Sequence, residues 1–332
     1  LSLGALALAG FLLLRRRSRH GNPYGVDLRR HGSSATGRSQ AGDATGDGAA
    51  SPGFAYGRTP APAHLGPYRV LEVLGRGGCA TTYLGVHERT GQQAALKVPH
   101  PHVLVDAEFR QRFWREAELG RLLDHPRIPQ MLESGTEQDP WLAMAFVEGI
   151  TLEAHLLEHG QLRLSQAIHI ALEVTEALAH AHARGVVHRD LKPSNIMLGS
   201  RGAMVLDFGI ARLTDTANTA TALLLGTPAY FAPEGLQSAR VGPAADRYAL
   251  GILLYEMLTG QKPFTGDNPF HILEQHRTQP LPEVNLLRPE ASPRLVRLVE
   301  RLAQKDPTAR PEDLEVLELL RALAAQHPVE GR

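Results

Sequence analysis

The chain has 332 residues, which is enough for one large domain or two ordinary ones with a sizeable core. Lys and Arg together number 35, and so do Asp and Glu, so the charge balance gives no indication of a nucleic-acid or acidic partner, and we expect no nucleic acid among the partners. The single cysteine, Cys79, excludes an internal disulfide framework and fits a reducing compartment.

Residues 1–17 have the composition of a membrane segment with a basic flank. Residues 1–14 are apolar or small, and the sequence RRRSR at 15–19 follows directly. Because a helix needs about 20 apolar residues to cross a bilayer, we interpret this stretch as the end of a transmembrane helix whose basic flank lies in the cytoplasm. The alternatives are the apolar region of a signal peptide, in which the charges usually come first, or upstream sequence misassigned to this chain.

The next segment, residues 18–64, is predicted to be a flexible linker. It is rich in Gly, Ser, Ala, Pro, Arg and Thr, and it shows neither helical nor strand periodicity. Ordered sequence begins near Tyr68, so we expect the folded part of the chain to start there.

Three strands are predicted at the start of the ordered region. Residues 68–74 alternate between apolar and polar side chains, residues 75–80 form a glycine-rich turn (GRGGCA), and residues 81–86 and 92–98 follow as strands. A glycine turn also occurs in dinucleotide-binding folds, where it opens into a helix. Here β-branched and aromatic residues follow, so we predict a hairpin.

Helical patterns dominate the rest of the chain. An apolar stripe predicts a helix over 106–123, and an apolar strand is predicted over 141–147. Capping and turn residues predict three further helices over 151–160, 165–185 and 244–258, and Ser165 is the predicted N-cap of the second of these. Two more helices are predicted to begin at residues 292 and 311. Strands first and helices later predict an α+β fold with a small antiparallel-sheet lobe and a larger helical lobe.

The loop at residues 188–195, with the sequence HRDLKPSN, concentrates chemically active side chains. It holds a carboxylate at Asp190, a cation at Lys192 and an amide at Asn195. A short apolar strand and a turn lead on to Asp207, which begins the sequence DFG. Two acidic residues and an amide set close together are the groups that hold Mg²⁺ on a nucleotide and orient a hydroxyl beside it.

On these two motifs the chain resembles the protein kinase family, specifically the bacterial Hanks-type serine/threonine kinases. The resemblance covers about residues 65–325, with an N-terminal lobe over 65–147 and a C-terminal lobe over 148–325. It implies a two-lobed kinase fold that uses ATP with Mg²⁺, or with Mn²⁺ as an alternative ion. It also implies transfer of the γ-phosphate to Ser and Thr hydroxyls of protein substrates.

The resemblance implies a role for each charged residue of the cleft. Lys97 matches the strand lysine that contacts the α- and β-phosphates. Glu116 has the family spacing for the helix glutamate that pairs with this lysine, whereas Glu118 is expected to be a surface charge. Asp190 would orient the proton of the attacking hydroxyl, and Lys192 would neutralise the γ-phosphate in transit.

The same resemblance implies the nucleotide and metal sites. Asn195 and Asp207 would hold the metal ions, Met144 matches the gatekeeper, and the backbone of residues 145–147 would bind the base. The residues expected to contact the nucleotide are Leu74, Gly75, Gly77, Ala95, Lys97, Met144, Ala145, Val147 and Met197. His188 is expected to pack beneath the phenylalanine of DFG.

Two residues of the glycine-rich turn depart from the family pattern. Ala80 stands in place of the third glycine, adds a methyl group near the phosphates and disfavours a positive φ if the turn needs one. Thr82 stands in place of a valine and brings a hydroxyl to the adenine face. We expect weaker nucleotide affinity or a slower step, without loss of the site.

Residues 207–234 resemble an activation loop that ends in Ala-Pro-Glu. Thr219 and Thr221 are the candidate autophosphorylation sites, and Arg189 matches the cation that pairs with a phosphorylated loop residue. Among the scaffold residues that the resemblance implies, Arg310 is expected to form an ion pair with Glu234, the last residue of this loop.

The sequence therefore predicts a cytoplasmic protein kinase domain that is attached to the inner membrane of a bacterium and activated by autophosphorylation. A dimer in which one copy phosphorylates the other is a further expectation. The alternative is a pseudokinase, a scaffold or nucleotide-sensing module, which Ala80 and Thr82 would favour. A weaker alternative is phosphorylation of a small molecule on the same fold. The histidine pairs 155/159 and 180/182 are not expected to bind metal, because no third ligand is evident.

Overall fold

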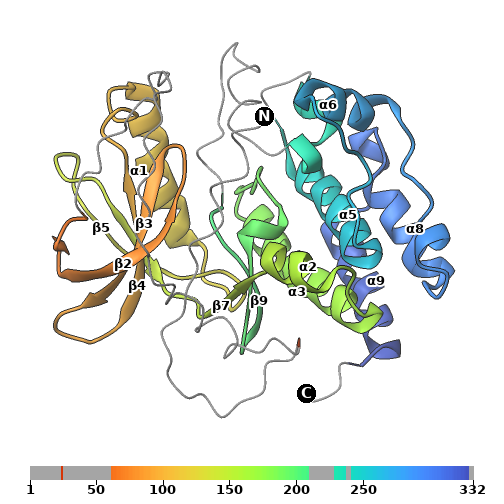
Figure 1. Cartoon of the computed structure of the whole chain (residues 1–332), viewed down its shortest axis with the longest axis horizontal. Helices are drawn as coiled ribbons and strands as arrows, with labels where there is room; N and C mark the ends of the chain where they lie inside the picture. Colours follow the sequence, from red (N-terminus) through yellow and green to blue (C-terminus); the bar gives the residue numbers. More distant parts are fainter. Residues whose placement is uncertain (1–23, 25–60, 209–227, 237–240, 329–332) are drawn as a thin grey trace, which may run out of the picture.

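The computed structural model describes residues 24, 61–208, 228–236 and 241–328. Two lobes lie side by side, the strand-rich lobe at the left of Figure 1 and the helical lobe at the right. The strand-rich lobe comes first in the chain, which confirms the α+β order predicted from the sequence.

The small lobe is built on a six-stranded sheet in the order β1-β2-β3-β4-β6-β5, with antiparallel neighbours. Its strands are β1 (His64–Leu65), β2 (Tyr68–Arg76), β3 (Ala80–His87), β4 (Gln93–Pro99), β5 (Met131–Ser134) and β6 (Leu142–Ala145). Tyr68, Leu96 and Trp141 are buried together in its core. β2 and β3 form the predicted hairpin, closed at the glycine-rich turn by a bond from Gly77 N to Ala80 O of 2.8 Å.

Helix α1 (Ala107–Leu122) packs against this sheet. Asp106 caps it by accepting hydrogen bonds from the backbone N–H groups of the first turn. Phe113 and Ala117 are buried against Leu142 of β6. Glu116 is buried as well, so the packing of α1 carries a carboxylate into the lobe interior.

The large lobe is mainly helical. Its described helices are α2 (Leu152–His159), α3 (Leu164–His182), α5 (Pro243–Thr259), α6 (Pro269–Thr278), α7 (Val284–Leu287), α8 (Pro293–Leu302) and α9 (Asp313–Gln326). Residues 245–259 of α5 are all buried, as expected for a helix at the centre of a lobe. α3 and α8 pack against α5, and α9 packs against α3. This lobe therefore forms a rigid base for the loops that reach the cleft.

Two of the predicted helix starts were wrong. Arg163, not Ser165, is the N-cap of α3, because Gln166 Oε1 accepts a hydrogen bond from the Arg163 N–H at 3.1 Å and closes the first turn two residues earlier. The last helix was predicted from position 311 but begins at Asp313. Helix α6 was not predicted from the sequence, although Asn268 caps it.

A second sheet lies in the large lobe, in the order β7-β8-β9. It consists of β7 (Gly149–Thr151), β8 (Ile196–Gly199) and β9 (Gly202–Val205). The loop at 188–195 ends in a 3₁₀ turn, Pro193–Asn195, that runs directly into β8. Because Ile196 pairs with Val205, the hairpin β8–β9 brings the end of this loop and Asp207 together at the same end of the sheet.

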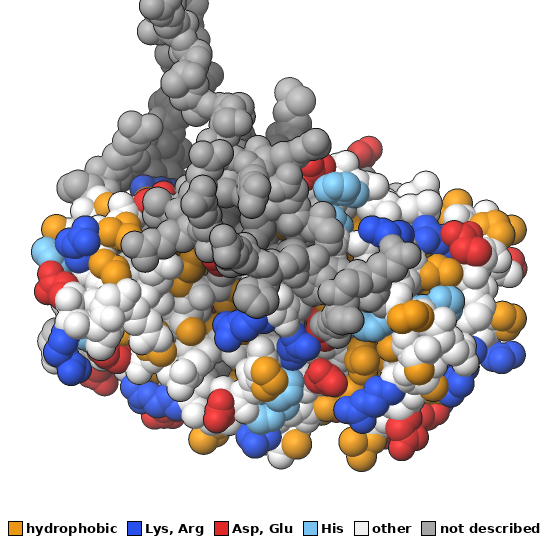
Figure 2. All heavy atoms as spheres, turned by 90° about the horizontal axis from the view of Figure 1, so that it is seen from below, with side chains coloured by type: hydrophobic (Ala, Val, Ile, Leu, Met, Phe, Trp, Pro, Cys, Tyr) orange, Lys and Arg blue, Asp and Glu red, His pale blue; other side chains and the backbone are white. Residues whose placement is uncertain are grey.

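No helix within the described ranges is both long and apolar enough to cross a bilayer. Residues 1–17, which we predicted to be a membrane segment, lie outside the described residues, as do Thr219 and Thr221. Figure 2 shows one face of the molecule, on which acidic, basic and apolar side chains are interspersed over both lobes. This mixed surface agrees with the even charge balance of the sequence.

Candidate active site

The loop at 188–195 is held in place from α5. Asp246 accepts a hydrogen bond from His188 N at 2.6 Å and another from Arg189 N at 2.8 Å. Arg189 has a φ of 63°, a left-handed backbone that a non-glycine residue keeps only where its surroundings enforce it. The buried His188 ring meets Phe208 edge-on, with 4.9 Å between the ring centroids, which confirms that His188 packs beneath this phenylalanine.

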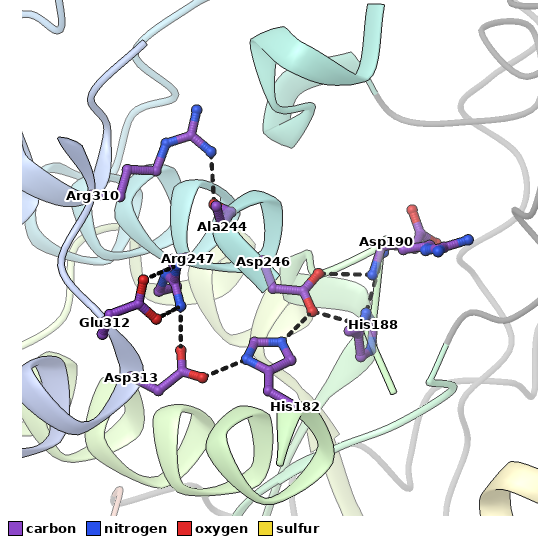
Figure 3. A network of polar contacts seen from close by, with 10 residues as sticks. His182, His188, Asp190, Ala244, Asp246, Arg247, Arg310, Glu312 and Asp313 are labelled. Carbon is purple, nitrogen blue, oxygen red and sulfur yellow. Dashed lines mark hydrogen bonds and ion pairs between the residues drawn. The ribbon is translucent and has the colours of Figure 1, made fainter. Parts of the chain in front are cut away.

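Behind this loop a network of charges reaches the last helix (Figure 3). His182, at the end of α3, lies 2.9 Å from Asp246 Oδ2 through Nε2 and 2.7 Å from Asp313 Oδ2 through Nδ1. Burial lowers the pKa of His182, but the hydrogen bonds to the two carboxylates outweigh burial and raise the pKa to about 9. Arg247 extends the network to Glu312 and Asp313. A charged His182 therefore links the loop to the start of α9.

Asp190, Lys192 and Asn195 form one hydrogen-bonded cluster. Lys192 Nζ donates to Asp190 Oδ2 at 2.8 Å. Asn195 Nδ2 donates to Asp190 O at 2.8 Å and to Asp190 Oδ2 at 3.3 Å. These bonds fix the carboxylate of Asp190 relative to its own loop, as positioning of a reacting hydroxyl would require.

Lys97 lies between two carboxylates. Its Nζ is 2.7 Å from Glu116 Oε1 and 3.5 Å from Asp207 Oδ1, whereas Glu118 is exposed. Burial alone lowers the pKa of Lys97, but the charges of Asp207 and Glu116 outweigh burial and raise its pKa above the ordinary value. The structure thereby joins β4, α1 and Asp207 through one ammonium group.

A cavity opens between the lobes beside this ion pair. It is lined by Leu74, Gly75, Thr82, Ala95, Pro129, Met144, Ala145, Phe146, Val147, Thr151, Ser194, Asn195, Met197, Leu206 and Asp207. The residues expected to surround the adenine all belong to this lining, and so do Asn195 and Asp207. Gly77 and Lys97 are the expected nucleotide contacts that do not. The cavity is mostly apolar at the base end and polar where the two motifs meet.

Four lining residues were not predicted from the sequence. Leu206 and Ser194 are each adjacent in sequence to a motif residue, and this adjacency could have indicated that they line the cavity. Thr151 caps α2 and follows the segment between the lobes. Its sequence signal indicates a helix cap and does not indicate a position in the cavity lining. Pro129 lies between α1 and β5 and carries no sequence signal of its own.

The glycine-rich turn is held from the end of β4. His100 N donates to Cys79 O at 2.8 Å, and the ring lies 3.3 Å from Gly78 O through Nδ1 and 2.9 Å from Thr81 Oγ1 through Nε2. Ala80 belongs to β3 and does not have a positive φ. The left-handed backbone that an alanine would disfavour is therefore not needed at this position.

Asn195 and Asp207 are the residues that could hold a metal ion. Both line the cavity, and the Asp207 side chain is 46% exposed. Asn195 uses its amide nitrogen for its bonds to Asp190, which leaves its amide oxygen available. Carboxylate and amide oxygens are ligands that Mg²⁺ accepts in proteins, so this donor set fits Mg²⁺.

The end of the segment that resembles an activation loop is anchored to the large lobe. Arg310 donates from Nη1 to Glu234 Oε1 at 2.6 Å and from Nη2 to Glu234 Oε2 at 2.7 Å. It also donates to Ala244 O at 2.7 Å. The expected pairing of Arg310 with Glu234 is confirmed, and the two parallel bonds make it a bidentate pair.

Comparison with known proteins gives this geometry a context. Residues 68–321 match the family model described as the protein kinase domain. The probable serine/threonine-protein kinase pknA2 of Bifidobacterium longum is 34% identical over 279 residues, which cover 82% of this chain and 37% of that protein. The serine/threonine-protein kinase PrkC of Bacillus subtilis is 36% identical over 256 residues, 76% of this chain and 40% of PrkC. The chain thus spans less than half the length of these curated relatives.

Solved structures show the same two-lobed arrangement. The kinase domain of Mycobacterium tuberculosis PknI superposes with a TM-score of 0.61 at 30% identity, covering 78% of this chain and 95% of that domain. Residues 1–466 of Rad53, in complex with AMP-PNP, superpose with a TM-score of 0.65 at 26% identity, covering 76% of this chain and 64% of that one.

Proposed function

Because the chain belongs to the protein kinase family, we propose that it is a protein serine/threonine kinase that transfers the γ-phosphate of ATP to protein hydroxyls. The observation that carries the proposal is the position of Lys97, paired with Glu116 and 3.5 Å from Asp207, beside a cavity between the lobes. Phosphoryl transfer depends mainly on positioning and on charges placed near the phosphate oxygens. A fixed cation beside a metal-binding carboxylate supplies both.

Each residue of the site has a distinct part in this proposal. Lys97 binds the α- and β-phosphate oxygens, and Glu116 holds its ammonium group in place. Asp190 accepts a hydrogen bond from the incoming hydroxyl and orients it toward the γ-phosphorus. Lys192, 2.8 Å from Asp190, neutralises charge on the phosphate during transfer.

A divalent ion completes the charge balance of the site. Asn195 and Asp207 are the residues that would hold Mg²⁺, or Mn²⁺ in its place. When bound, the ion supplies neutralising charge to the phosphate oxygens. The apolar lining from Leu74, Ala95 and Met197 encloses the base, and the backbone of 145–147 offers it hydrogen-bonding groups.

Incubation of the chain with γ-labelled ATP and Mg²⁺ tests this proposal. We expect label on threonine or serine in the unaltered chain, and a loss of at least about 100-fold in Lys97→Met and Asp190→Asn, because each removes a positioned charge. Lys262→Met and Asp267→Asn are matched controls, since both residues are exposed and lie outside the cavity. Nucleotide binding without any transfer by the unaltered chain would contradict the proposal and favour a scaffold.

We also propose that loop autophosphorylation activates the enzyme and that residues 1–17 attach it to the inner membrane. The threonines at 219 and 221 support the first of these proposals, and the apolar run with its basic flank supports the second.

Intact-protein mass spectrometry of a Thr219→Ala, Thr221→Ala double variant tests whether these threonines are the autophosphorylation sites. Membrane fractionation of cells that express the chain with and without residues 1–17 checks the second. Transfer between two differently tagged copies would test whether a dimer acts in trans.

A further inference from the structure

Tyr24 is embedded in the large lobe although it precedes the catalytic domain in the chain. Its side chain is 1% exposed and belongs to the buried hydrophobic cluster of that lobe. Its hydroxyl donates a hydrogen bond to Glu173 Oε2, and its backbone oxygen accepts one from Gln166 Nε2 at 2.8 Å. The main chain and the side chain of Tyr24 therefore both form hydrogen bonds to the large lobe.

The two partners of Tyr24 lie on one face of α3. Gln166 and Glu173 are seven residues apart, which is two helical turns or about 10 Å along the axis. Tyr24 consequently lies lengthwise along the helix, with its carbonyl at one end of this stretch and its hydroxyl at the other. A contact that binds a residue at both ends is selective for tyrosine, because a shorter or apolar side chain would leave Glu173 without this donor.

The acidic end of this contact is built independently of Tyr24. Glu173 is 2% exposed, accepts a hydrogen bond from Ala203 N at 2.7 Å and pairs with Arg127 Nη2 at 2.7 Å. A Cβ atom at Gly202 would lie 2.6 Å from Glu173 Oε1, so only glycine lets the backbone approach so closely. A buried carboxylate is stable only when it is paired in this way. The carboxylate is thus held ready for a further donor.

We propose that Gln166, Glu173, Arg127 and Gly202 form a docking socket for a tyrosine side chain, and that Tyr24 occupies it and is thereby anchored to the large lobe. The socket requires a neutral hydroxyl donor. Phenylalanine lacks the donor, and a phosphotyrosine would bring two negative charges against the buried carboxylate of Glu173.

The position of the socket connects it to both sides of the cleft. Arg127 lies between α1, which carries Glu116, and β5, and its backbone oxygen accepts a hydrogen bond from Val205 N at 2.8 Å. Val205 ends β9, two residues before Asp207. Docking of Tyr24 therefore braces the two connections that lead to the ion pair of Lys97. The docking itself does not depend on phosphoryl transfer, so its test is independent of the proposed activity.

Hydrogen–deuterium exchange on the full chain tests the anchor. We expect Tyr24→Ala to speed exchange in the hairpin over 199–205 and in the first half of α3. Glu173 loses the hydroxyl donor, and the backbone oxygen of residue 24 is no longer held against Gln166 by a buried side chain. Tyr56→Ala is the matched control, a tyrosine from the same part of the sequence, and should leave both stretches unchanged. Exchange in Tyr24→Ala equal to that of the unaltered chain would overturn the proposal.

A peptide added in trans distinguishes a docking socket from an ordinary core position. A synthetic peptide with the sequence of residues 18–30 should bind the Tyr24→Ala chain and restore its protection. The same peptide with phenylalanine at position 24 should bind about 10-fold more weakly, and the phosphotyrosine form should not restore protection. A folded Tyr24→Ala chain that ignores the tyrosine peptide would show that Tyr24 is an integral core residue, and would overturn the proposal.

Should Tyr24→Ala fail to fold, Tyr24→Phe still tests the hydroxyl contact, since it keeps the ring. We expect a melting temperature lowered by about 2–4 °C, the shift typical for loss of one hydrogen bond in a domain of this size. An unchanged melting temperature, with unchanged exchange at 199–205, would mean that Glu173 does not bind this hydroxyl and that the socket is misassigned.

Discussion

Lys97 illustrates how a single side chain depends on opposing effects. Burial disfavours the charged form of Lys97, and the carboxylates of Asp207 and Glu116 stabilise that form. The Glu116 side chain is only 8% exposed, so removing the lysine leaves a buried carboxylate without its cation. Loss of one partner of such a pair costs roughly 3–5 kcal/mol. Lys97→Met should therefore lose stability as well as activity, and its transfer assay needs a melting curve beside it.

The glycine-rich turn gives a prediction at Ala80. Because Ala80 lies in β3 with an ordinary strand backbone, its methyl group causes no left-handed strain. We expect Ala80→Gly to bind ATP equally or more tightly, since it removes a methyl group near the phosphates. Isothermal titration with ATP and Mg²⁺ measures this, and a clear loss of affinity would show that the turn has been misinterpreted.

His100 gives a second prediction for the same turn. It contacts Gly78, Cys79 and Thr81 at once, so it holds the turn over the cavity. His100→Ala should raise the KM for ATP by about 3–10-fold with a smaller change in kcat, because it removes an ordering contact worth roughly 1 kcal/mol. His271→Ala, at an exposed histidine of α6 outside the cavity lining, is the control. Equal KM values for the two variants would exclude a holding role for His100.

At the scale of elements, the site depends on how α3, α5 and α9 meet. Asp246 of α5 binds the backbone of the loop that carries Asp190, and His182 of α3 ties Asp246 to Asp313 at the start of α9 (Figure 3). The loop geometry, including the left-handed Arg189, is therefore set by three helices that are far apart in the sequence. This dependence explains why the charge state of one histidine should influence the whole lobe.

The network makes the stability of the chain depend on pH. The folded pKa of His182, about 9, lies above the ordinary 6.5, so its contribution is fully present below pH 6.5 and is lost as the pH rises through 9. The difference between the folded and the ordinary pKa of His182 corresponds to roughly 3 kcal/mol. Burial alone raises the pKa of Asp313, but the hydrogen bond to His182 and the charges of His182 and Arg247 outweigh burial and lower it. The contribution of Asp313 to stability is therefore present above pH 3.8 and fades only in stronger acid.

Urea unfolding between pH 6 and 10 measures this effect. The free energy of unfolding of the unaltered chain, taken relative to that of His182→Gln, should fall across this range. Lys305 acts in the opposite direction, because burial lowers its pKa to about 8 and stability is gained as it loses its proton. The informative quantity is therefore the difference between the two chains. A difference that does not change with pH would contradict a charged His182.

Local sequence signals predicted most of the helices and strands, and they failed where contacts between distant parts of the chain determine the structure. The helix starts near Asp106, Thr151 and Ser292 could be predicted, because each of these side chains accepts a hydrogen bond from its own helix, a relation that depends on local sequence alone. The start of α3 was missed, since Arg163 is not a usual cap residue. In the site, residues inside the two motifs could be named. Pro129 and Tyr24 could not, because only the fold brings them to the cavity and to α3.

At the scale of the whole molecule, the cavity is made by both lobes. Leu74 and Ala95 come from the small lobe, and Met197 and Asp207 come from the large lobe. Neither lobe can enclose a nucleotide alone. A ligand that bridges the lobes stabilises the folded state by binding both at once, so binding should be visible in the melting temperature.

Thermal unfolding with ATP, with and without Mg²⁺, tests this coupling. At a ligand concentration of about 100 Kd, binding adds roughly 2.7 kcal/mol, which should raise the melting temperature by about 5–10 °C in a domain of this size. Asp207→Asn should lose the part of the shift that Mg²⁺ adds and keep the part due to the nucleotide, because it changes a metal ligand while Leu74, Ala95 and Met197 still line the cavity. Asp267→Asn serves as the control. If Mg²⁺ added the same shift to Asp207→Asn as to the unaltered chain, the metal would lie elsewhere in the cleft.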